Sequence, residues 1–321
     1  MFAYTIRRLG ALAVTFLFMT MIVFASIRAI PGSTIDLMME SADITTAGSE
    51  VGARHGLERA LGLDRPVHVQ YLKWLGQIVT EGSLGRSLWS GAPVTESILS
   101  RLPVTMELGG LAIILSLIIG IPAGAYAAVR QDTLFDYAAR WTAILVMAKP
   151  TFWLATMVVV LPSIWWGWSP DLVYVHLSED PLRNLYQNLI PAGIMGLGLG
   201  AVTMRMTRAM MLEVLRQDFV RTARAKGLPE RTIVTRHILR NALIPVVTLV
   251  GLELPLMFGG AVIMEQIFSI PGMGLLLLEA AGRRDYPIVV GVFLVVGAAV
   301  LITNLLVDLA YALLDPKIRY S

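Results

Sequence analysis

The sequence predicts an all-α, polytopic membrane protein with six transmembrane helices and both termini in the cytoplasm. Its 321 residues are 56% hydrophobic and only 15% charged, whereas soluble proteins carry about 25% charged residues. Several uncharged stretches reach the ~20 residues that a helix needs to cross the hydrocarbon of a bilayer. Basic residues concentrate in alternate connecting segments, and this bias indicates how the helices are oriented.

Four of the six expected spans contain no charged residue. Their lengths are 19, 22, 21 and 22 residues, and they cover residues 9–27, 108–129, 184–204 and 286–307. The third and fifth spans are expected at 141–170 and 241–278. Lys149 is the only charged residue in the third, and Glu253 and Glu265 are the only ones in the fifth. At a rise of about 1.5 Å per residue, each stretch can cross roughly 30 Å of hydrocarbon.

The first expected span has one feature of a signal peptide, because Arg7 and Arg8 precede an apolar run. Its 19 uncharged residues exceed the roughly 7–15 residues of the apolar region of a signal peptide. A clear small-x-small cleavage site does not follow before Arg28. We therefore expect residues 1–30 to form a retained transmembrane helix.

The distribution of charge orients the chain. Expected cytoplasmic segments hold 15 Lys or Arg against 6 acidic residues, and they are 1–8, 130–140, 205–245 and 315–321. Expected outer segments hold 9 basic against 13 acidic residues, and they are 31–103, 165–188 and 268–287. Because positive charge favours the cytoplasmic side, we expect an extracytoplasmic region at 31–103. A five-helix core at 104–321 would then carry the basic segment 205–245 on its cytoplasmic side.

Several kinds of chemistry are excluded or disfavoured. The chain has no Cys, so it forms no disulfide, and its net charge of +3 is too small to suggest nucleic acid. A phosphate-binding GxxxxGK[ST] loop is missing, so we expect no ATP site in this chain. A metal site is not expected, because His55, His68, His176 and His237 are scattered, and we find no catalytic nucleophile with a base. Glycines in "GIMGLGLG" (193–200) are expected to permit close helix contact.

The basic segment 205–245 has the pattern of a helix, a tight turn and a second helix. Gly227 can end the first helix, and Pro229 can open the second, which would run towards Leu243. An apolar stripe on the first helix is predicted from Leu212, Leu215, Phe219 and Ala223. Such a segment could serve only as a topology signal at the lipid surface. Its length of some forty residues favours instead a shaped surface on which a partner docks.

The stretch "RTARAKG" followed by "HILRNALIPV" resembles the cytoplasmic coupling loop of ABC-importer permeases, in the variant of the dipeptide/oligopeptide/nickel family. Arg221 stands where the general motif has Glu, and Arg240 where it has Pro. Gly227 falls on the Gly of the motif. The resemblance implies that the loop contacts an ATPase subunit through Arg221, Thr222, Ala223, Arg224, Ala225, Lys226, Gly227 and Leu228.

The similarity extends over almost the whole chain, to the B-type subunit of this family. It is carried in order by "LGLDRPVHVQYLKWL", "GSLGRSLWSGAPV", "RLPVTMEL", "PTFWLA", "GGAVIMEQIFSIPGMG", "RDYPIV" and "NLLVDLAYALLDPKIRY". It implies a type I ABC-importer permease fold in a bacterial inner membrane, and import of short peptides by alternating access. The implied partners are a homologous second permease subunit, two ATPase subunits and an extracytoplasmic substrate-binding protein. ATP and Mg²⁺ would bind to the ATPases, and this chain would be no enzyme.

Other functions remain open at this point. The same machinery could import nickel chelates, glutathione or another small solute, since the family that the chain resembles serves several. The binding protein is expected to set most of the choice of substrate. A stand-alone secondary transporter would show charged residues in several spans and an inverted repeat, and no convincing repeat is found. A membrane-embedded hydrolase would need a nucleophile and a base. Neighbouring genes and co-purifying subunits would discriminate among these functions.

Three ionisable residues interrupt the expected spans, and such residues are candidates for function because they are costly in a bilayer. Lys149 and Glu253 would each lie about 15 Å inside their spans, near the middle of the bilayer. We expect them either to pair as a structural or gating contact or to face the substrate pathway separately. Glu265 is the third candidate for the pathway.

Overall fold

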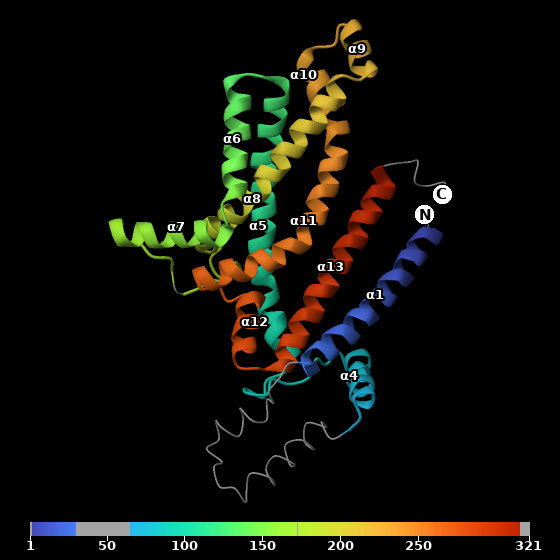
Figure 1. The fold of residues 1–321 in the computed structure, drawn as a ribbon, viewed down its shortest axis with the longest axis vertical. Helices are drawn as coiled ribbons and strands as arrows, with labels where there is room; N and C mark the ends of the chain where they lie inside the picture. Colours follow the sequence, from blue (N-terminus) through green and yellow to red (C-terminus); the bar gives the residue numbers. More distant parts are fainter. Residues whose placement is uncertain (1, 30–64, 172, 315–321) are drawn as a thin grey trace, which may run out of the picture. The chain divides into compact units, whose positions relative to one another are not determined.

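The computed structural model describes residues 2–29, 65–171 and 173–314, and helices dominate this part of the chain. In the described ranges β structure is limited to one isolated bridge, between Arg86 and Pro93. Figure 1 shows the helices: α1 Phe2–Ala29, α4 Val67–Glu81, α5 Val94–Val129, α6 Leu134–Ala148, α7 Thr151–Trp166, α8 Pro181–Leu215, α9 Asp218–Ala225, α10 Glu230–Thr232, the π-helix η1 Ile233–Ile238, α11 Leu239–Phe268, α12 Met273–Gly282 and α13 Tyr286–Leu314. The all-α prediction is confirmed.

The chain divides into two compact units. Unit 1 contains residues 1–5, 103–275 and 302–321, and unit 2 contains residues 6–102 and 276–301. Unit 1 therefore holds most of α5 together with α6 to α11. Unit 2 holds most of α1, all of α4 and the beginning of α13.

Among the described residues, five helices are long and apolar enough to cross a membrane, and up to seven spans result if each of two bent helix pairs counts as one. The predicted number of six lies within this range. The spans expected at 9–27, 108–129, 184–204 and 286–307 fall within α1, α5, α8 and α13. The fifth expected span covers α11 and part of α12. A second bend lies between the end of α11 and α12, where residues 257–268 and 273–282 meet at an angle of 77°.

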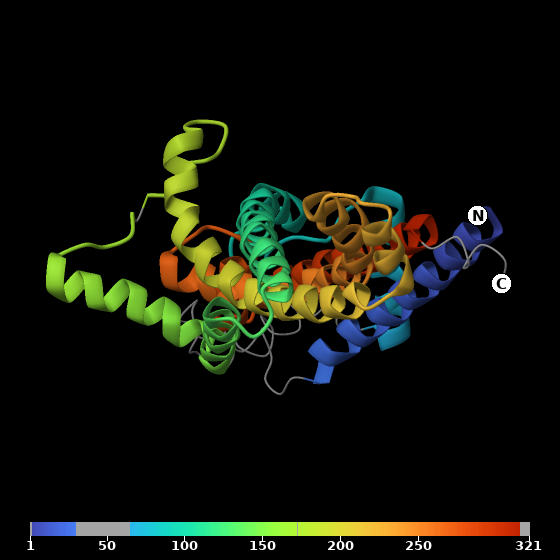
Figure 2. The ribbon, with the colours of Figure 1, turned by 90° about the horizontal axis from the view of Figure 1, so that it is seen from above.

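The third expected span is not one straight helix. It consists of α6 and α7, which meet at an angle of 92°. In Figure 2 α6 is seen nearly end-on, and α7 runs sideways from it. The bend lies at Lys149, which has extended backbone angles (φ −98°, ψ 132°). Pro150 follows, and a proline disfavours the helical conformation of the residue before it. The sequence therefore contained the signal for this break.

Glycines bring α5 and α8 into close contact within unit 1. A Cβ atom on Gly124 of α5 would lie 2.5 Å from the carbonyl oxygen of Met204, and one on Gly120 would lie 2.8 Å from that of Gly200. From the other side, a Cβ on Gly196 would lie 2.8 Å from the carbonyl oxygen of Ala112. Small residues let transmembrane helices approach in this way. The predicted role of the 193–200 glycines is thus confirmed for Gly196.

Replacing Gly124 with Leu should destabilise unit 1 by about 3 kcal/mol or more, because the new side chain meets backbone atoms that cannot move aside alone. Gly198 on α8 gives a matched control, since nothing lies within 4 Å of a Cβ placed there. Thermal unfolding of the detergent-solubilised protein measures both changes. Equal melting temperatures for Gly124→Leu and Gly198→Leu would show that the close contact is unimportant.

In unit 2 the segment between α4 and α5 folds into a tight hairpin. Ser87 Oγ donates to Asp285 Oδ2 at 2.5 Å, and the backbone N–H of Leu88 donates to Asp285 Oδ1 at 3.1 Å. Trp89 Nε1 donates to the carbonyl oxygen of Arg283 at 2.8 Å. These contacts fasten the hairpin to the turn before α13. The helix α4 lies in the region 31–103 that is expected outside the membrane, whereas residues 30–64 lie outside the described part.

Candidate coupling site

Within the basic segment 205–245, α8 ends at Leu215 and α9 starts at Asp218. Gln217, between them, is extended (φ −75°, ψ 151°). The first helix is therefore interrupted, but three residues of the predicted stripe still pack in one apolar cluster, and they are Leu212, Leu215 and Ala223. Phe219, expected to be buried, is 39% exposed, whereas Val220 is fully buried.

Gly227 makes the turn that the sequence predicted. Its φ of +75° lies in the left-handed region, and nothing lies within 4 Å of a Cβ placed on it. The Leu228 N–H donates to the carbonyl oxygen of Ala223, and the Gly227 N–H donates to that of Arg224. This pair of bonds forms a Schellman motif, which ends α9. Pro229 then precedes α10 with φ −65° and ψ 138°, so both predicted helix boundaries are confirmed.

One face of the turn is anchored in an apolar cluster of unit 1. Its buried members come from α5, α8, α9, η1 and α11, and they are Ala128, Met211, Val214, Val220, Ala223, Ile233, Ile238 and Ala242. Ile233 and Ile238 are five residues apart, and both are fully buried. The i→i+5 bonding of a π-helix brings residues at this spacing to one side. The π-turn therefore fixes the second helix to the same cluster as α9.

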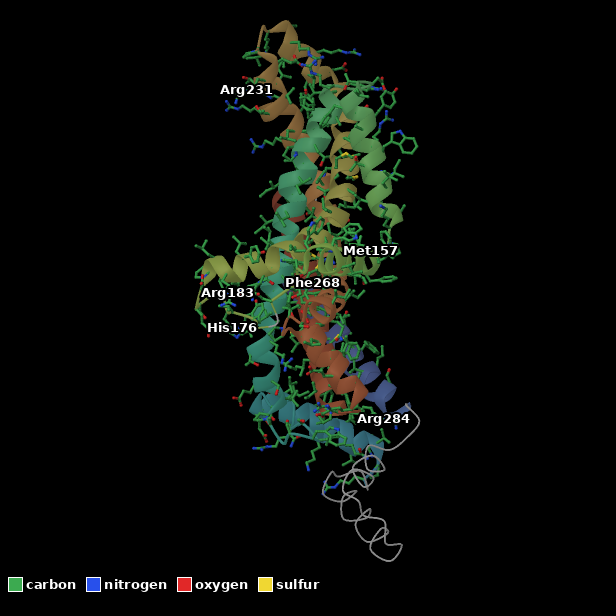
Figure 3. All side chains as sticks on the ribbon, turned by 90° about the vertical axis from the view of Figure 1, so that its left-hand side faces the viewer. Met157, His176, Arg183, Arg231, Phe268 and Arg284 are labelled. Atoms are coloured by element: carbon green, nitrogen blue, oxygen red, sulfur yellow. The ribbon has the colours of Figure 1, made fainter. Side chains whose placement is uncertain are left out.

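The opposite face of the turn is exposed, and below we call α9 together with residues 226–232 the coupling turn. Seven of the eight predicted contact residues are exposed on it, and only Ala223 faces inward. Leu228 is 39% exposed, as is Phe219, so two apolar side chains lie among basic ones. Arg224 is held by Glu230, with an Nη2 to Oε1 distance of 2.7 Å. In Figure 3 Arg231 marks the end of unit 1 that carries this turn.

A buried ion pair fixes α8 to α6 near the coupling turn. Asp136 is fully buried, and Arg208 Nε and Nη2 donate to its two carboxylate oxygens at 2.6 and 2.8 Å. The backbone N–H of Asp132 also donates to this carboxylate, at 3.0 Å. Arg140 lies farther away, with an N···O distance of 3.4 Å. Since Arg208 is seven residues before the end of α8, the pair sets the position of the helix that leads into the turn.

The predicted pairing of Lys149 with Glu253 is not found. Among the described residues no ion pair joins the two; Lys149 Nζ lies 5.6 Å from the centre of the Trp153 ring. The estimate of equal depth assumed a straight third span, whereas α6 ends at Ala148. A role of either residue in the substrate pathway stays a prediction.

Glu265 is fully buried, and it fastens α11 to the start of α12. Its Oε1 accepts from Thr105 Oγ1 at 2.6 Å, and its Oε2 accepts from the Leu275 N–H at 2.9 Å. Thr105 Oγ1 in turn accepts from the Met273 N–H at 2.8 Å. A Cβ on Gly272 would collide with the Glu265 carboxyl group. The carboxylate thus closes the first turn of α12, which is where negative charge is favoured.

Replacing Glu265 with Gln should destabilise this corner by roughly 1–3 kcal/mol, because one acceptor oxygen becomes an NH₂ group facing a donor. Glu279, which is exposed on α12, supplies the control variant Glu279→Gln. Limited proteolysis of the folded protein would detect a loosened α11–α12 corner. If Glu265→Gln is cleaved as slowly as Glu279→Gln, the carboxylate does not hold the corner.

The family follows from comparison with known proteins. A family model described as the inner membrane component of binding-protein-dependent transport systems matches residues 120–320. The chain belongs to this family. A second model, for the N-terminal part of such membrane components, matches residues 1–109. As a member of the family the chain is a multi-pass inner membrane protein and one subunit of a transport complex.

The relatives of this membrane component include named transport proteins. The chain is 40% identical over 324 residues to a putative peptide permease protein of Brucella suis. It is 37% identical to the dipeptide transport system permease protein DppB of Escherichia coli K12 and 37% identical to the oligopeptide transport system permease protein AppB of Bacillus subtilis. All three comparisons cover 100% of both chains.

A crystal structure of an amino acid ABC transporter has the same fold. It matches with a TM-score of 0.54 at 13% identity, over 68% of this chain and 94% of the other. At this identity the likeness concerns the fold alone. This likeness agrees with the expected ABC-importer permease fold.

Two structural features of this membrane component were not predicted from the sequence. Phe219 was placed in the apolar stripe but lies on the exposed side of α9, and the Asp136–Arg208 pair was not foreseen. A sequence signal existed for the first, because Gln217 and Asp218 can start a new helix. No local signal pairs Asp136 with a residue 72 positions away.

Proposed function

We propose that this chain is the transmembrane permease subunit of an ATP-driven importer of short peptides. Its relatives from Brucella suis, Escherichia coli and Bacillus subtilis carry names for peptide, dipeptide and oligopeptide transport. These names favour peptides over nickel chelates, glutathione or another small solute. The proposed complex adds a homologous permease, two ATPases that bind ATP and Mg²⁺, and an extracytoplasmic binding protein.

The observation that carries the proposal is the coupling turn, which exposes one face and buries the other. Its exposed face carries Phe219 and Leu228 beside basic residues, a composition suited to a groove on a partner. Its buried face packs on α8 and α11, which are 35 and 30 residues long. A displacement of the docked face therefore moves two membrane helices, because packed elements shift as rigid bodies.

In this mechanism ATP supplies the energy and the permease supplies two conformations. Closure of the ATPases on ATP displaces the coupling turn and favours one conformation, and hydrolysis allows return to the other. The residues proposed for the ATPase contact are those on the exposed face, Arg221, Thr222, Arg224, Ala225, Lys226, Gly227 and Leu228. Ala223 supports the face from within the apolar cluster.

Co-expression with the neighbouring genes, followed by reconstitution into proteoliposomes, tests the function. We expect ATPase subunits to co-purify, and uptake of a labelled dipeptide to require internal ATP and the binding protein. Glutathione and a nickel chelate serve as competing solutes. Uptake driven by a proton gradient without ATP would contradict the proposal and favour a secondary transporter.

A further inference from the structure

A pocket of about 210 Å³ opens in unit 1, at the opposite end from the coupling turn. Its volume is below the roughly 300–1,000 Å³ of most small-molecule sites, so it suits a single residue or a small group. The walls come from the segment after α7, the first turns of α8 and the end of α11. They are formed by Trp168, Ser169, Pro170, Asp171, Tyr174, Tyr186, Gln187, Ile190, Phe268, Ser269 and Ile270.

A polar network stands directly behind Tyr174 in this wall. The Tyr174 hydroxyl donates to Glu107 Oε2 at 3.1 Å and lies 3.0 and 3.2 Å from the Nδ2 atoms of Asn184 and Asn188. Burial raises the pKa of this hydroxyl above its usual value, so it stays protonated at neutral pH. Tyr174 therefore donates to the carboxylate without neutralising it.

Among the described residues, this network keeps a negative charge without an ion-pair partner and one hydrogen-bond acceptor without a donor. No ion pair of the described residues involves Glu107. Asn188 is 2% exposed, and its Oδ1 atom has no hydrogen-bond partner among the described residues. Asp171 lines the pocket itself, and its contact with Arg183 is long, at 3.5 Å between two half-exposed side chains. A ligand that brings hydrogen-bond donors and positive charge complements this excess.

The aromatic walls favour the same class of ligand. Four aromatic side chains line the pocket, and they are Trp168, Tyr174, Tyr186 and Phe268. The faces of aromatic rings attract ammonium groups, and this attraction strengthens when the cation is desolvated. Figure 3 shows Phe268, with Arg183 and His176 on the neighbouring segments of this unit.

We propose that this pocket binds a cationic ammonium or guanidinium group of the cargo on the extracytoplasmic side. This proposal rests on the proposed function for its cargo, a short peptide. Two sources of the cation share this chemistry: the terminal ammonium of the peptide, and a Lys or Arg side chain. Asp171 and Glu107 supply the negative charge, and the aromatic walls make the pocket selective against anions.

Direct binding can be measured in the assembled transporter without any transport. Fluorotryptophan labelling gives a ¹⁹F NMR signal for Trp168, which the Trp168→Phe variant identifies. Butylammonium should shift this signal in a saturable way, and neutral butanol should not. Asp171→Asn and Glu107→Gln should each weaken the binding about tenfold, whereas Glu179→Gln, which alters an exposed acid of the same outer segment, should not. Equal shifts with butanol, or none with butylammonium, would overturn the proposal.

Uptake of two dipeptides distinguishes the two sources of charge. Lys-Ala and Met-Ala have similar side-chain lengths, and both carry a terminal ammonium. If the pocket takes the side chain, Asp171→Asn should raise KM about tenfold for Lys-Ala only; if it takes the terminus, KM should rise for both. Affinities of the isolated binding protein stay unchanged, because the substitution lies in the permease.

The two measurements separate this proposal from the proposed function. If wild-type protein imports both dipeptides and neither KM changes in Asp171→Asn and Glu107→Gln, the pocket does not recognise the cargo. If wild-type protein imports no peptide but butylammonium still binds near Trp168, the peptide assignment fails and the cation site stands.

Discussion

Replacing Asp136 with Asn should destabilise the protein by about 3–5 kcal/mol, the usual effect of removing one partner of a buried ion pair. The carboxylate is fully buried and accepts two bonds from Arg208 and one from the Asp132 N–H. An amide in its place can accept from only one side of the guanidinium. It also leaves the Arg208 charge in a site where the side chain is only 16% exposed.

A double-mutant cycle tests whether this effect belongs to the pair. We expect Asp136→Asn and Arg208→Met each to be strongly destabilising and the double variant to lose much less than their sum, because it leaves no unpaired buried charge. Denaturant unfolding in detergent gives the four free energies. Arg140→Met is the control, and it should cost less than about 1 kcal/mol, since Arg140 is 36% exposed and 3.4 Å from the carboxylate. Additive losses would mean that the two residues act separately.

The membrane helices could be predicted because hydrophobic length is a local property of the sequence. The uncharged runs at 9–27, 108–129, 184–204 and 286–307 all fall inside single helices. The prediction that the third span is a single helix was wrong, because the apolar composition of the segment continues through the break at Lys149 and Pro150 and gives no sign of it. Composition determines whether a segment suits the bilayer, whereas the proline determines where the helix breaks and its axis changes direction.

In the coupling turn, too, some features could be predicted from local sequence and others could not. Gly227 and Pro229 were predicted at the turn because their backbone preferences are intrinsic. Which side of α9 faces inward was predicted only in part, because the helix breaks at Gln217. Ala223 of the predicted stripe is buried, whereas Phe219 is exposed.

The ionisable residues of the expected spans were found from sequence, but their partners were not. Glu265 accepts from Thr105, which is 160 residues away, and only the fold brings these residues together. Because it is buried and accepts hydrogen bonds from both Thr105 and the Leu275 N–H, Glu265 stabilises the α11–α12 corner. Glu107 escaped notice altogether, because it directly precedes the uncharged run of its span, and its significance depends on Tyr174 and Asn184.

Coupling through the turn at Gly227 should be lost in Gly227→Trp, while the protein still assembles in the membrane. The left-handed backbone (φ +75°) opposes any side chain, and the bulky ring would also project from the exposed surface that we assign to the ATPase contact. Uptake should fall by at least about tenfold, which corresponds to about 1.4 kcal/mol of lost interaction, and ATP hydrolysis should no longer depend on cargo. Gly82 gives a closely matched control, because it also ends a helix at positive φ (62°) with nothing within 4 Å of a Cβ.

The most direct measurement is the ratio of peptide uptake to ATP hydrolysis for wild-type, Gly227→Trp and Gly82→Trp complexes in proteoliposomes. Both substitutions introduce a similar backbone strain, so the two variants differ only in which surface the new side chain alters. The account predicts that the ratio collapses for Gly227→Trp and stays near the wild-type value for Gly82→Trp. A normal ratio in a well-assembled Gly227→Trp complex would contradict the assignment of this turn as the ATPase contact.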